Sequence, residues 1–228
     1  MKQLALDIGL STRPTLDSFF SGPNEAVLNH LRLWTSGGTR APVPTYLWGD
    51  AGSGKTHLLQ AVHQALTAQG LAVGWLDSYT FHPPEFNDDW VAVLMDDVHL
   101  YNSEQQHTAF NWFVNALTPR TGTPRWVLAA GSLPPADLQL RDDLRTRLGW
   151  GHVYGLQVLD EAARRAVLRQ AAESRGLFLS DEVVAYMLKR FSRDLGSLMQ
   201  LLDHLDHYAM QTQRALTIPL VRAMLENE

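Results

Sequence analysis

Residues 49–56 read Gly-Asp-Ala-Gly-Ser-Gly-Lys-Thr, a full match to the phosphate-binding pattern G-x-x-x-x-G-K-[ST]. A short apolar run at 45–48 precedes this loop and an amphipathic stretch at 56–68 follows it, so the loop joins a strand to a helix. In such a loop, backbone N–H groups and the helix N-terminus face an anion. We expect Lys55 to reach the β- and γ-phosphates of a nucleotide and Thr56 to hold Mg²⁺. The expected nucleotide-binding residues of the loop are Gly49, Gly52, Ser53, Gly54, Lys55 and Thr56.

A pair of acids follows the apolar run 90–95. Asp96 is placed to hold Mg²⁺, directly or through water, and Asp97 to orient or activate an attacking water. An apolar strand with two terminal acids is a weak pattern alone, but it becomes a strong one downstream of an intact phosphate loop. Ser132, after the apolar run 126–130, has two open interpretations: a contact to the γ-phosphate or water, and an ordinary turn serine.

Two arginines are candidates for contacts with phosphates. Arg147 lies near the end of an expected helix, from where it could complete the site of a neighbouring subunit. An arginine finger of this kind accelerates hydrolysis by roughly 10³ to 10⁵. Arg193, at the start of a later helix, could reach the phosphates of its own site. For both residues the alternative is a solvated surface position, which is the more common fate of arginine.

Strand and helix patterns alternate up to residue 157 and then give way to helices alone. This order predicts an α/β domain, with a parallel sheet between flanking helices, followed by a small helical domain. Asp160 and Ser180 are expected helix N-caps, and Gly176 a helix stop. The expected domains are a tail at 1–12, an α/β domain at 13–157 and a helical domain at 158–228. The expected strands are 45–48, 71–76, 91–96, 125–131 and 152–157, and the expected helices are 24–35, 55–68, 103–117, 136–148, 160–174, 181–191, 194–212 and 218–226.

The charge distribution limits the partners of the protein. The net charge is −5, and no Lys or Arg occurs between His57 and Pro119, a stretch that holds seven acids. A surface that tracks DNA needs cations against phosphates, so we expect no direct sequence-specific DNA binding. The absence of cysteine, of a signal peptide and of a long apolar run indicates a cytoplasmic protein without a membrane segment.

Two weaker patterns have ordinary explanations. His204 and His207, at i and i+3 beside acids, could bind a metal on one helix face, but no third ligand is apparent, so a solvated face is the better interpretation. The seven tryptophans could suggest base stacking. Because cations are missing from the central stretch, we expect core or interface packing instead.

Taken together, the phosphate loop, the acid-tipped strand, the trailing arginine and the helical C-terminal part resemble the AAA+ superfamily. More narrowly, segments 15–22, 147–151 and 215–221 resemble the DnaA-like family, and in particular its branch of regulatory inactivators of the initiator DnaA. The resemblance implies an AAA+ α/β domain with a helical lid that binds ADP or ATP with Mg²⁺. It implies that Arg147 is the arginine finger, that Arg193 is the lid arginine called sensor 2, and that 16–20 is the adenine-side linker.

The N-terminal tail gains meaning from the same resemblance. Residues 3–8, Gln-Leu-Ala-Leu-Asp-Ile, resemble the peptide that docks on the β sliding clamp of DNA polymerase III. Gln3 would supply hydrogen bonds, and the apolar side chains would fill a cleft on the clamp. The expected clamp-binding residues are Gln3, Leu4, Leu6 and Ile8.

The function implied by the resemblance is negative regulation of chromosomal replication initiation, by stimulating hydrolysis of the ATP bound to DnaA. The alternatives are a DNA-remodelling AAA+ ATPase such as a helicase loader, and an adaptor with a vestigial site. Because the phosphate loop is intact, a weak ATPase activity of the protein itself stays open, as does self-association. Ser132 stands where relatives often have Asp, and we expect no helix-turn-helix domain after the lid.

Overall fold

The computed structural model describes residues 14–36, 43–119, 122, 124–190 and 195–226. The chain divides into two compact units, one of Pro14–Val158 and one that takes in the chain from Leu159 onward. We call them the α/β unit and the helical unit and describe each by itself. Among the described helices, none is both long and apolar enough to cross a membrane.

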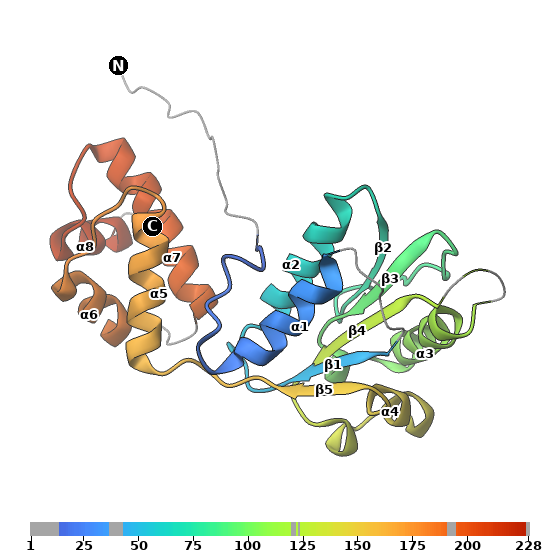
Figure 1. Cartoon of the computed structure of the whole chain (residues 1–228). Helices are drawn as coiled ribbons and strands as arrows, with labels where there is room; N and C mark the ends of the chain where they lie inside the picture. The colour runs from blue at the N-terminus through green and yellow to red at the C-terminus, as the bar shows by residue number, and fades with distance from the viewer. Residues whose placement is uncertain (1–13, 37–42, 120–121, 123, 191–194, 227–228) are drawn as a thin grey trace. The chain divides into compact units, whose positions relative to one another are not determined.

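The α/β unit is built on a five-stranded sheet in the order β2-β3-β4-β1-β5, with all pairs parallel (Figure 1). The predicted parallel sheet is therefore confirmed. Parallel pairing brings the carboxyl ends of all five strands to one edge, where ligands bind in open α/β sheets. The strands are β1 (Thr45–Trp48), β2 (Ala72–Leu76), β3 (Trp90–Met95), β4 (Trp126–Gly131) and β5 (His152–Gly155).

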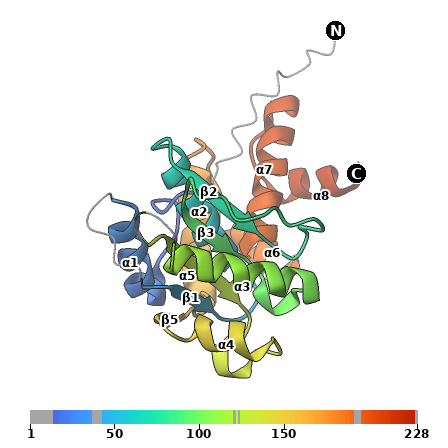
Figure 2. The ribbon, with the colours of Figure 1, turned by 90° about the vertical axis from the view of Figure 1, so that its right-hand side faces the viewer.

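Helices cover both faces of this sheet. On one face lie α1 (Glu25–Thr35) and α2 (Lys55–Thr67), and on the other lie α3 (Ser103–Leu117) and α4 (Asp142–Leu148) (Figures 1 and 2). Alternate residues of each strand feed the two resulting cores. In β4, for example, Leu128 packs with α1 and α2, whereas Val127 packs with α3 and α4.

One predicted helix is wrong in its extent. The sequence suggested a helix over 136–148, but the chain makes a short 3₁₀ turn at Pro135–Asp137 and begins α4 only at Asp142. Between them, Leu138 is extended and buried, Gln139 is exposed and Leu140 is buried. This alternation is that of an extended segment, and burial of the two leucines in the core of α3 and α4 outweighs the helical propensity of the segment.

A tight junction connects α4 to β5. A Cβ atom added at Gly151 would lie 1.9 Å from the carbonyl oxygen of Pro44, the residue before β1. The neighbouring His152 N–H donates to the same oxygen at 2.9 Å. Only glycine lets the two backbones approach this closely, so Gly151 sets the path of the chain from α4 into β5.

The helical unit packs its four helices around its own leucine-rich core. The Asp160 side chain caps the first helix by accepting from the Ala163 N–H at 2.7 Å, and Gly176, with φ +71°, follows the end of that helix. Arg175, only 11% exposed, pairs with Asp203 at 2.5 Å. The helices are α5 (Glu161–Glu173), α6 (Asp181–Arg190), α7 (Leu195–Thr212) and α8 (Ile218–Glu226).

Candidate nucleotide-binding site

The loop 49–54 leaves the carboxyl end of β1 and enters α2 at Lys55, as the motif requires. Gly54 stands directly before the helix with φ +96°. A Cβ atom there would also lie 2.6 Å from the ring of Phe19, so backbone conformation and space both demand glycine. The chain thus presents a left-handed turn at a helix N-terminus, the geometry that aims backbone N–H groups at a phosphate.

The Lys55 side chain is buried within the loop, with 7% exposure. Its Nζ donates to the carbonyl oxygens of Gly49 at 2.7 Å and Asp50 at 2.9 Å, and to Ser53 Oγ at 3.4 Å. Burial lowers the pKa of Lys55, while Asp97, Asp96 and Asp50 favour its charged form. A phosphate group would offer this ammonium a stronger partner than the neutral carbonyls do.

Asp96 lies beside the first turn of α2 and is almost fully buried, with 3% exposure. Burial, assisted by repulsion from Asp97, raises its pKa to about 6. The Thr56 hydroxyl, the Asp97 N–H and the charge of Lys55 act in the opposite direction. The structure therefore brings Asp96, Thr56 and Lys55 together in one site at the carboxyl edge of the sheet.

Asp97 has a strained backbone. Its φ of +50° and ψ of +41° are left-handed, a conformation that side chains other than glycine rarely adopt. Such strain concentrates at functional sites, where the surroundings fix it. Asp97 is half-buried and electrostatically coupled to Lys55, so it belongs to the same site as Asp96.

Two histidines, His57 and His99, belong to this region and are not among the site residues predicted from the sequence, whereas Phe19 lies in the expected linker 16–20. His57 Nε2 lies 3.1 Å from the Thr15 carbonyl oxygen and 3.3 Å from Ser18 Oγ, and the Phe19 ring packs against the His57 ring. These contacts fix the segment preceding α1 against the phosphate loop. His99 interacts electrostatically with Asp97 and Lys55, and burial lowers its pKa. The only sequence signal of the two histidines is that His57 follows the phosphate loop and His99 follows the acid pair.

Ser132 directly follows β4, whose last residue, Gly131, lies opposite Trp48 of β1. This register puts the half-buried Ser132 at the same sheet edge as the phosphate loop. The adjacent Leu133 carbonyl accepts from the Tyr46 hydroxyl at 2.8 Å, which holds the turn in place. A contact from Ser132 to the γ-phosphate stays a prediction.

Arg147 lies in the last turn of α4, a helix that packs on the sheet face shared with α3 and leads into the amino end of β5. Its guanidinium carbon lies 4.8 Å from the ring centre of Phe110 in α3 and 4.9 Å from that of Trp150. The two other arginines of this region each pair with an acid: Arg141 with Asp143 at 2.6 Å and Arg145 with Asp142 at 2.7 Å. In the described part of the chain, no carboxylate pairs with Arg147.

The remaining predicted site residues lie outside the described residues. They are Arg193 of the lid and the tail residues Gln3, Leu4, Leu6 and Ile8.

The two weaker patterns can be compared with the side-chain contacts of the described residues. No group of three or more metal-ligating side chains occurs among the described residues, and His207 lies 2.7 Å from the Gln211 amide. Trp34 stacks on Trp126 at 3.4 Å between ring centres within the core, and Trp112 is buried. Of the three tryptophans named here and Trp150, only the last is largely exposed.

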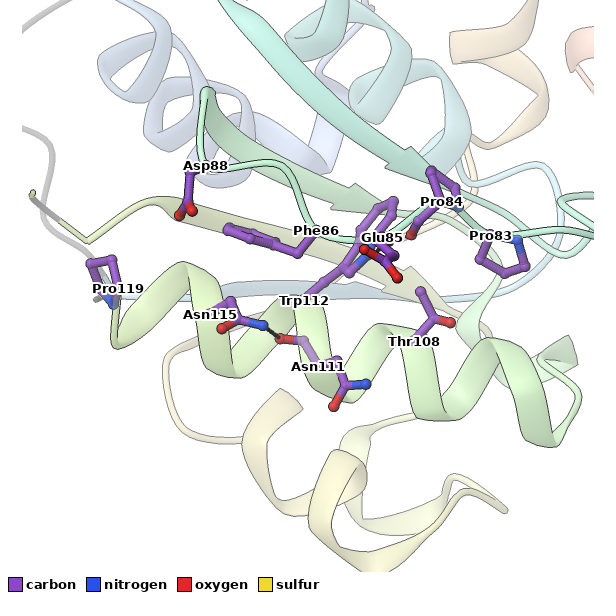
Figure 3. A pocket seen from close by; sticks show the side chains of 10 residues that line it. All are labelled: Pro83, Pro84, Glu85, Phe86, Asp88, Thr108, Asn111, Trp112, Asn115 and Pro119. Carbon is purple, nitrogen blue, oxygen red and sulfur yellow. Dashed lines mark hydrogen bonds between the residues drawn. The ribbon is translucent and has the colours of Figure 1, made fainter. Parts of the chain in front are cut away.

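A groove of about 430 Å³ lies between α3 and the chain that leads from β2 to β3 (Figure 3). Its floor includes Trp112, whose indole N–H donates to the Pro84 carbonyl at 3.2 Å, and its rim includes Glu85 and Asp88. No Lys or Arg is among its lining residues. The groove is therefore unsuited to a nucleic-acid backbone.

Comparison with known proteins links this geometry to a family. Residues 160–225, within the helical unit, match the family of Hda lid domains. The whole chain is similar to domain III of the replication initiation protein DnaA from Thermotoga maritima, with a TM-score of 0.73 and 22% identity over 93% of this chain and 95% of that one. Residues 160–225 therefore form an Hda lid domain, and the whole chain has the fold of DnaA domain III.

Two other structures share the AAA+ fold. AMPPCP-bound DnaA from Aquifex aeolicus superposes with a TM-score of 0.66 and 22% identity, over 88% of this chain and 68% of that one. The RuvB Holliday junction branch migration motor of Thermotoga maritima gives a TM-score of 0.66 at 15% identity, over 94% and 72%. At these identities the two matches speak for the fold alone.

The residues of this site fit a Mg²⁺–nucleotide ligand. Thr56 offers a hydroxyl and Asp96 a carboxylate, and the Thr56 hydroxyl acts to lower the pKa of Asp96; such hard oxygen donors are the ligands Mg²⁺ prefers. Asp96 is buried, with a raised pKa, so a nearby cation would stabilise its charged form. When bound, the ion would supply charge neutralisation for the phosphates.

Proposed function

We propose that this protein is a DnaA-related regulator of replication initiation that stimulates hydrolysis of the ATP held by DnaA. In this proposal its own loop binds ATP or ADP, and Arg147 is presented to the nucleotide of DnaA. Residues 3–8 tether the protein to the sliding clamp. Hydrolysis on DnaA then switches initiation off.

The observation that carries the proposal is the free charge of Arg147. Within the described residues, Arg141 and Arg145 are each neutralised by an acid, whereas Arg147 contacts two aromatic rings. A cation kept ordered but without a carboxylate is suited to an anion supplied by another molecule. A guanidinium on the transferring phosphoryl group stabilises the charge of the transition state.

The position of Arg147 supports action on a partner rather than on the protein's own loop. Lys55 begins α2 on one face of the sheet, whereas Arg147 is stacked on Phe110 of α3 on the opposite face (Figure 1). The phosphate loop follows the carboxyl end of β1, whereas α4 leads into the amino end of β5, the parallel neighbour of β1, so Lys55 and Arg147 also belong to opposite edges of the sheet. Arg147 is therefore suited to complete a site on a neighbouring molecule.

The protein's own site supports nucleotide binding. The left-handed turn at Gly54, the buried Lys55 and the pair Thr56–Asp96 meet the needs of phosphates with Mg²⁺. The solved DnaA of Aquifex aeolicus holds AMPPCP in the same fold. Asp97, strained beside Asp96, is the residue that would orient a water, so weak hydrolysis at this site belongs to the proposal.

The direct test is to mix ATP-loaded DnaA, DNA-loaded clamp and this protein, and to measure the ADP formed on DnaA. We expect ADP formation to accelerate by at least about 10-fold, a small part of the range for an arginine finger. Replacing Gln3 and Leu4 by Ala should remove the acceleration in the presence of clamp-loaded DNA while leaving nucleotide binding unchanged.

Two results would contradict the proposal. The first is no acceleration despite binding to the clamp, which would indicate an adaptor. The second is ATP hydrolysis by this protein alone that DNA stimulates, which would indicate a helicase-loader type of ATPase.

A further inference from the structure

Arg147 is bracketed by two aromatic residues that the core does not require. In α3, the buried positions form one helical stripe, and Phe110 lies outside it; they are Gln105, Ala109, Trp112, Phe113 and Ala116. Trp150 is 60% exposed although tryptophan is the largest apolar side chain. An aromatic pair that contributes little to the core, yet meets at one arginine, calls for a role at that arginine.

The two rings restrict the orientation of the Arg147 guanidinium. Its central carbon lies within 5 Å of both ring centres, inside the range of about 6 Å for cation–π attraction. Trp150 is tied to the same arginine through the backbone, because its N–H donates to the Arg147 carbonyl at 3.1 Å. Phe110 comes from another helix, so the two rings hold the side chain from two independent elements.

The neighbouring Arg141 contacts one of the same rings but is oriented in a different way. Arg141 also lies over Phe110, at 5.1 Å, but its guanidinium is held by both oxygens of Asp143, at 2.6 and 2.7 Å. Its orientation is set by a salt bridge, which also neutralises its charge. Aromatic rings orient Arg147 without supplying a negative charge, so its full charge stays available.

We propose that Phe110 and Trp150 are positioning residues that hold the Arg147 guanidinium in the orientation needed by the phosphates of a partner-bound nucleotide. We call the pair the aromatic bracket. This inference rests on the proposed function. An ordered arginine loses less rotamer freedom when it enters the partner site, so the bracket raises the rate of the chemical step rather than the affinity of the complex.

The experiment compares Trp150→Ala, Phe110→Leu and their combination with Trp150→Phe, which keeps a ring. Leucine at 110 retains apolar volume, and Trp150 is exposed, so folding should persist and is checked by thermal unfolding. Phe81→Ala is the matched control, because Phe81 is a 73% exposed aromatic of the same unit, and its ring is not one of the two that Arg147 contacts. Arg147→Ala defines complete loss.

Two readouts are taken. Single-turnover hydrolysis on ATP-loaded DnaA gives the maximal rate constant and the half-saturating concentration. We expect each bracket variant to lower the maximal rate constant about three- to tenfold, with half-saturation changed less than about twofold. The ¹⁵Nε–H resonance of Arg147 in the protein alone should lose its ring-current shift in the same variants. Trp150→Phe, which keeps a ring, should retain most of the wild-type rate constant and most of the ring-current shift.

The outcomes separate the bracket from the proposed function. If the double variant hydrolyses at the wild-type maximal rate while Arg147→Ala does not, the bracket is wrong and the finger stands. If only half-saturation changes, Trp150 is a contact residue and the positioning role is wrong. If Arg147→Ala retains full stimulation, the proposed function is wrong and the positioning role is lost with it.

Discussion

At the scale of single residues, the site combines groups that are unfavourable without a ligand. Asp96 is buried with its pKa raised to about 6, and Lys55 is buried with its pKa lowered. Asp97 has a left-handed backbone. Each of these features costs stability in the free protein and would be relieved or used when phosphates and Mg²⁺ bind.

Asp96→Asn is expected to stabilise the free protein at neutral pH. In the wild type, the folded state binds the Asp96 proton more tightly than the unfolded state, whose pKa is near the ordinary 3.8. Stability from this group therefore falls as pH rises from about 4 through 6, by at most about 3 kcal/mol. Asparagine keeps an oxygen for the Thr56 hydroxyl but carries no charge, so the variant should gain about 1–3 kcal/mol at pH 7.5 and little at pH 4.

Urea unfolding, followed by tryptophan fluorescence at the two pH values, measures this difference. Taking the difference between variant and wild type cancels histidines that titrate in the same range. An equal pH dependence of the two proteins would contradict the raised pKa. The variant should also bind Mg²⁺–ATP more weakly, because it loses the carboxylate.

At the scale of elements, the junction of the phosphate loop with α2 and the junction of α4 with β5 position the side chains of the two proposed sites. The α4–β5 junction is the tighter of them, since Gly151 touches the backbone before β1. A second tie secures the other end of β5: the Asn24 amide donates to the Gln157 carbonyl at 2.9 Å and accepts from its N–H at 2.8 Å. These contacts fix the edge strand β5, which follows α4 and its Arg147 along the chain.

Gly151→Ala should lower the free energy of unfolding by at least about 2 kcal/mol, because the new methyl group would overlap a backbone carbonyl that cannot move aside. Gly149→Ala is the matched control, two residues away. Its Cβ would meet its nearest neighbours at 3.5 and 3.6 Å, so a change within about 0.5 kcal/mol is expected. The denaturant midpoints of the two variants measure this difference in stability. Equal midpoints for Gly151→Ala and Gly149→Ala would contradict the tight junction at Gly151.

The sequence predicted the elements more completely than their contacts. Continuous apolar runs mark β3 and β4, and the phosphate-loop motif locates the start of α2 at Lys55, because these patterns are local. The segment before Asp142 was misjudged because burial of Leu138 and Leu140 in the tertiary core outweighs local propensity. The raised pKa of Asp96 and the rings around Arg147 could not be predicted, since they depend on segments far apart in the chain.

At the scale of the whole molecule, charge separates the proposed function from that of a DNA-tracking motor. Residues 57–119 carry no Lys or Arg, and this stretch supplies β2, β3, α3 and the groove beside α3. Binding of this part to a nucleic-acid backbone would lack cations to replace the counterions. Among the described residues of the unit, Arg147 of α4 is an arginine without a carboxylate partner, which suits a single phosphate group on a partner.

The most direct test of this account is the rate of ATP hydrolysis on DnaA with Arg147→Ala and Arg145→Ala side by side. Both residues lie in the same short helix, but Arg145 is paired with Asp142, whereas Arg147 has no carboxylate partner among the described residues. Under single-turnover conditions with clamp-loaded DNA, Arg147→Ala should lower the stimulated rate at least about 100-fold with nucleotide and clamp binding intact, and Arg145→Ala should change it less than about twofold. Full stimulation by Arg147→Ala, or an equal loss in both variants, would contradict the account.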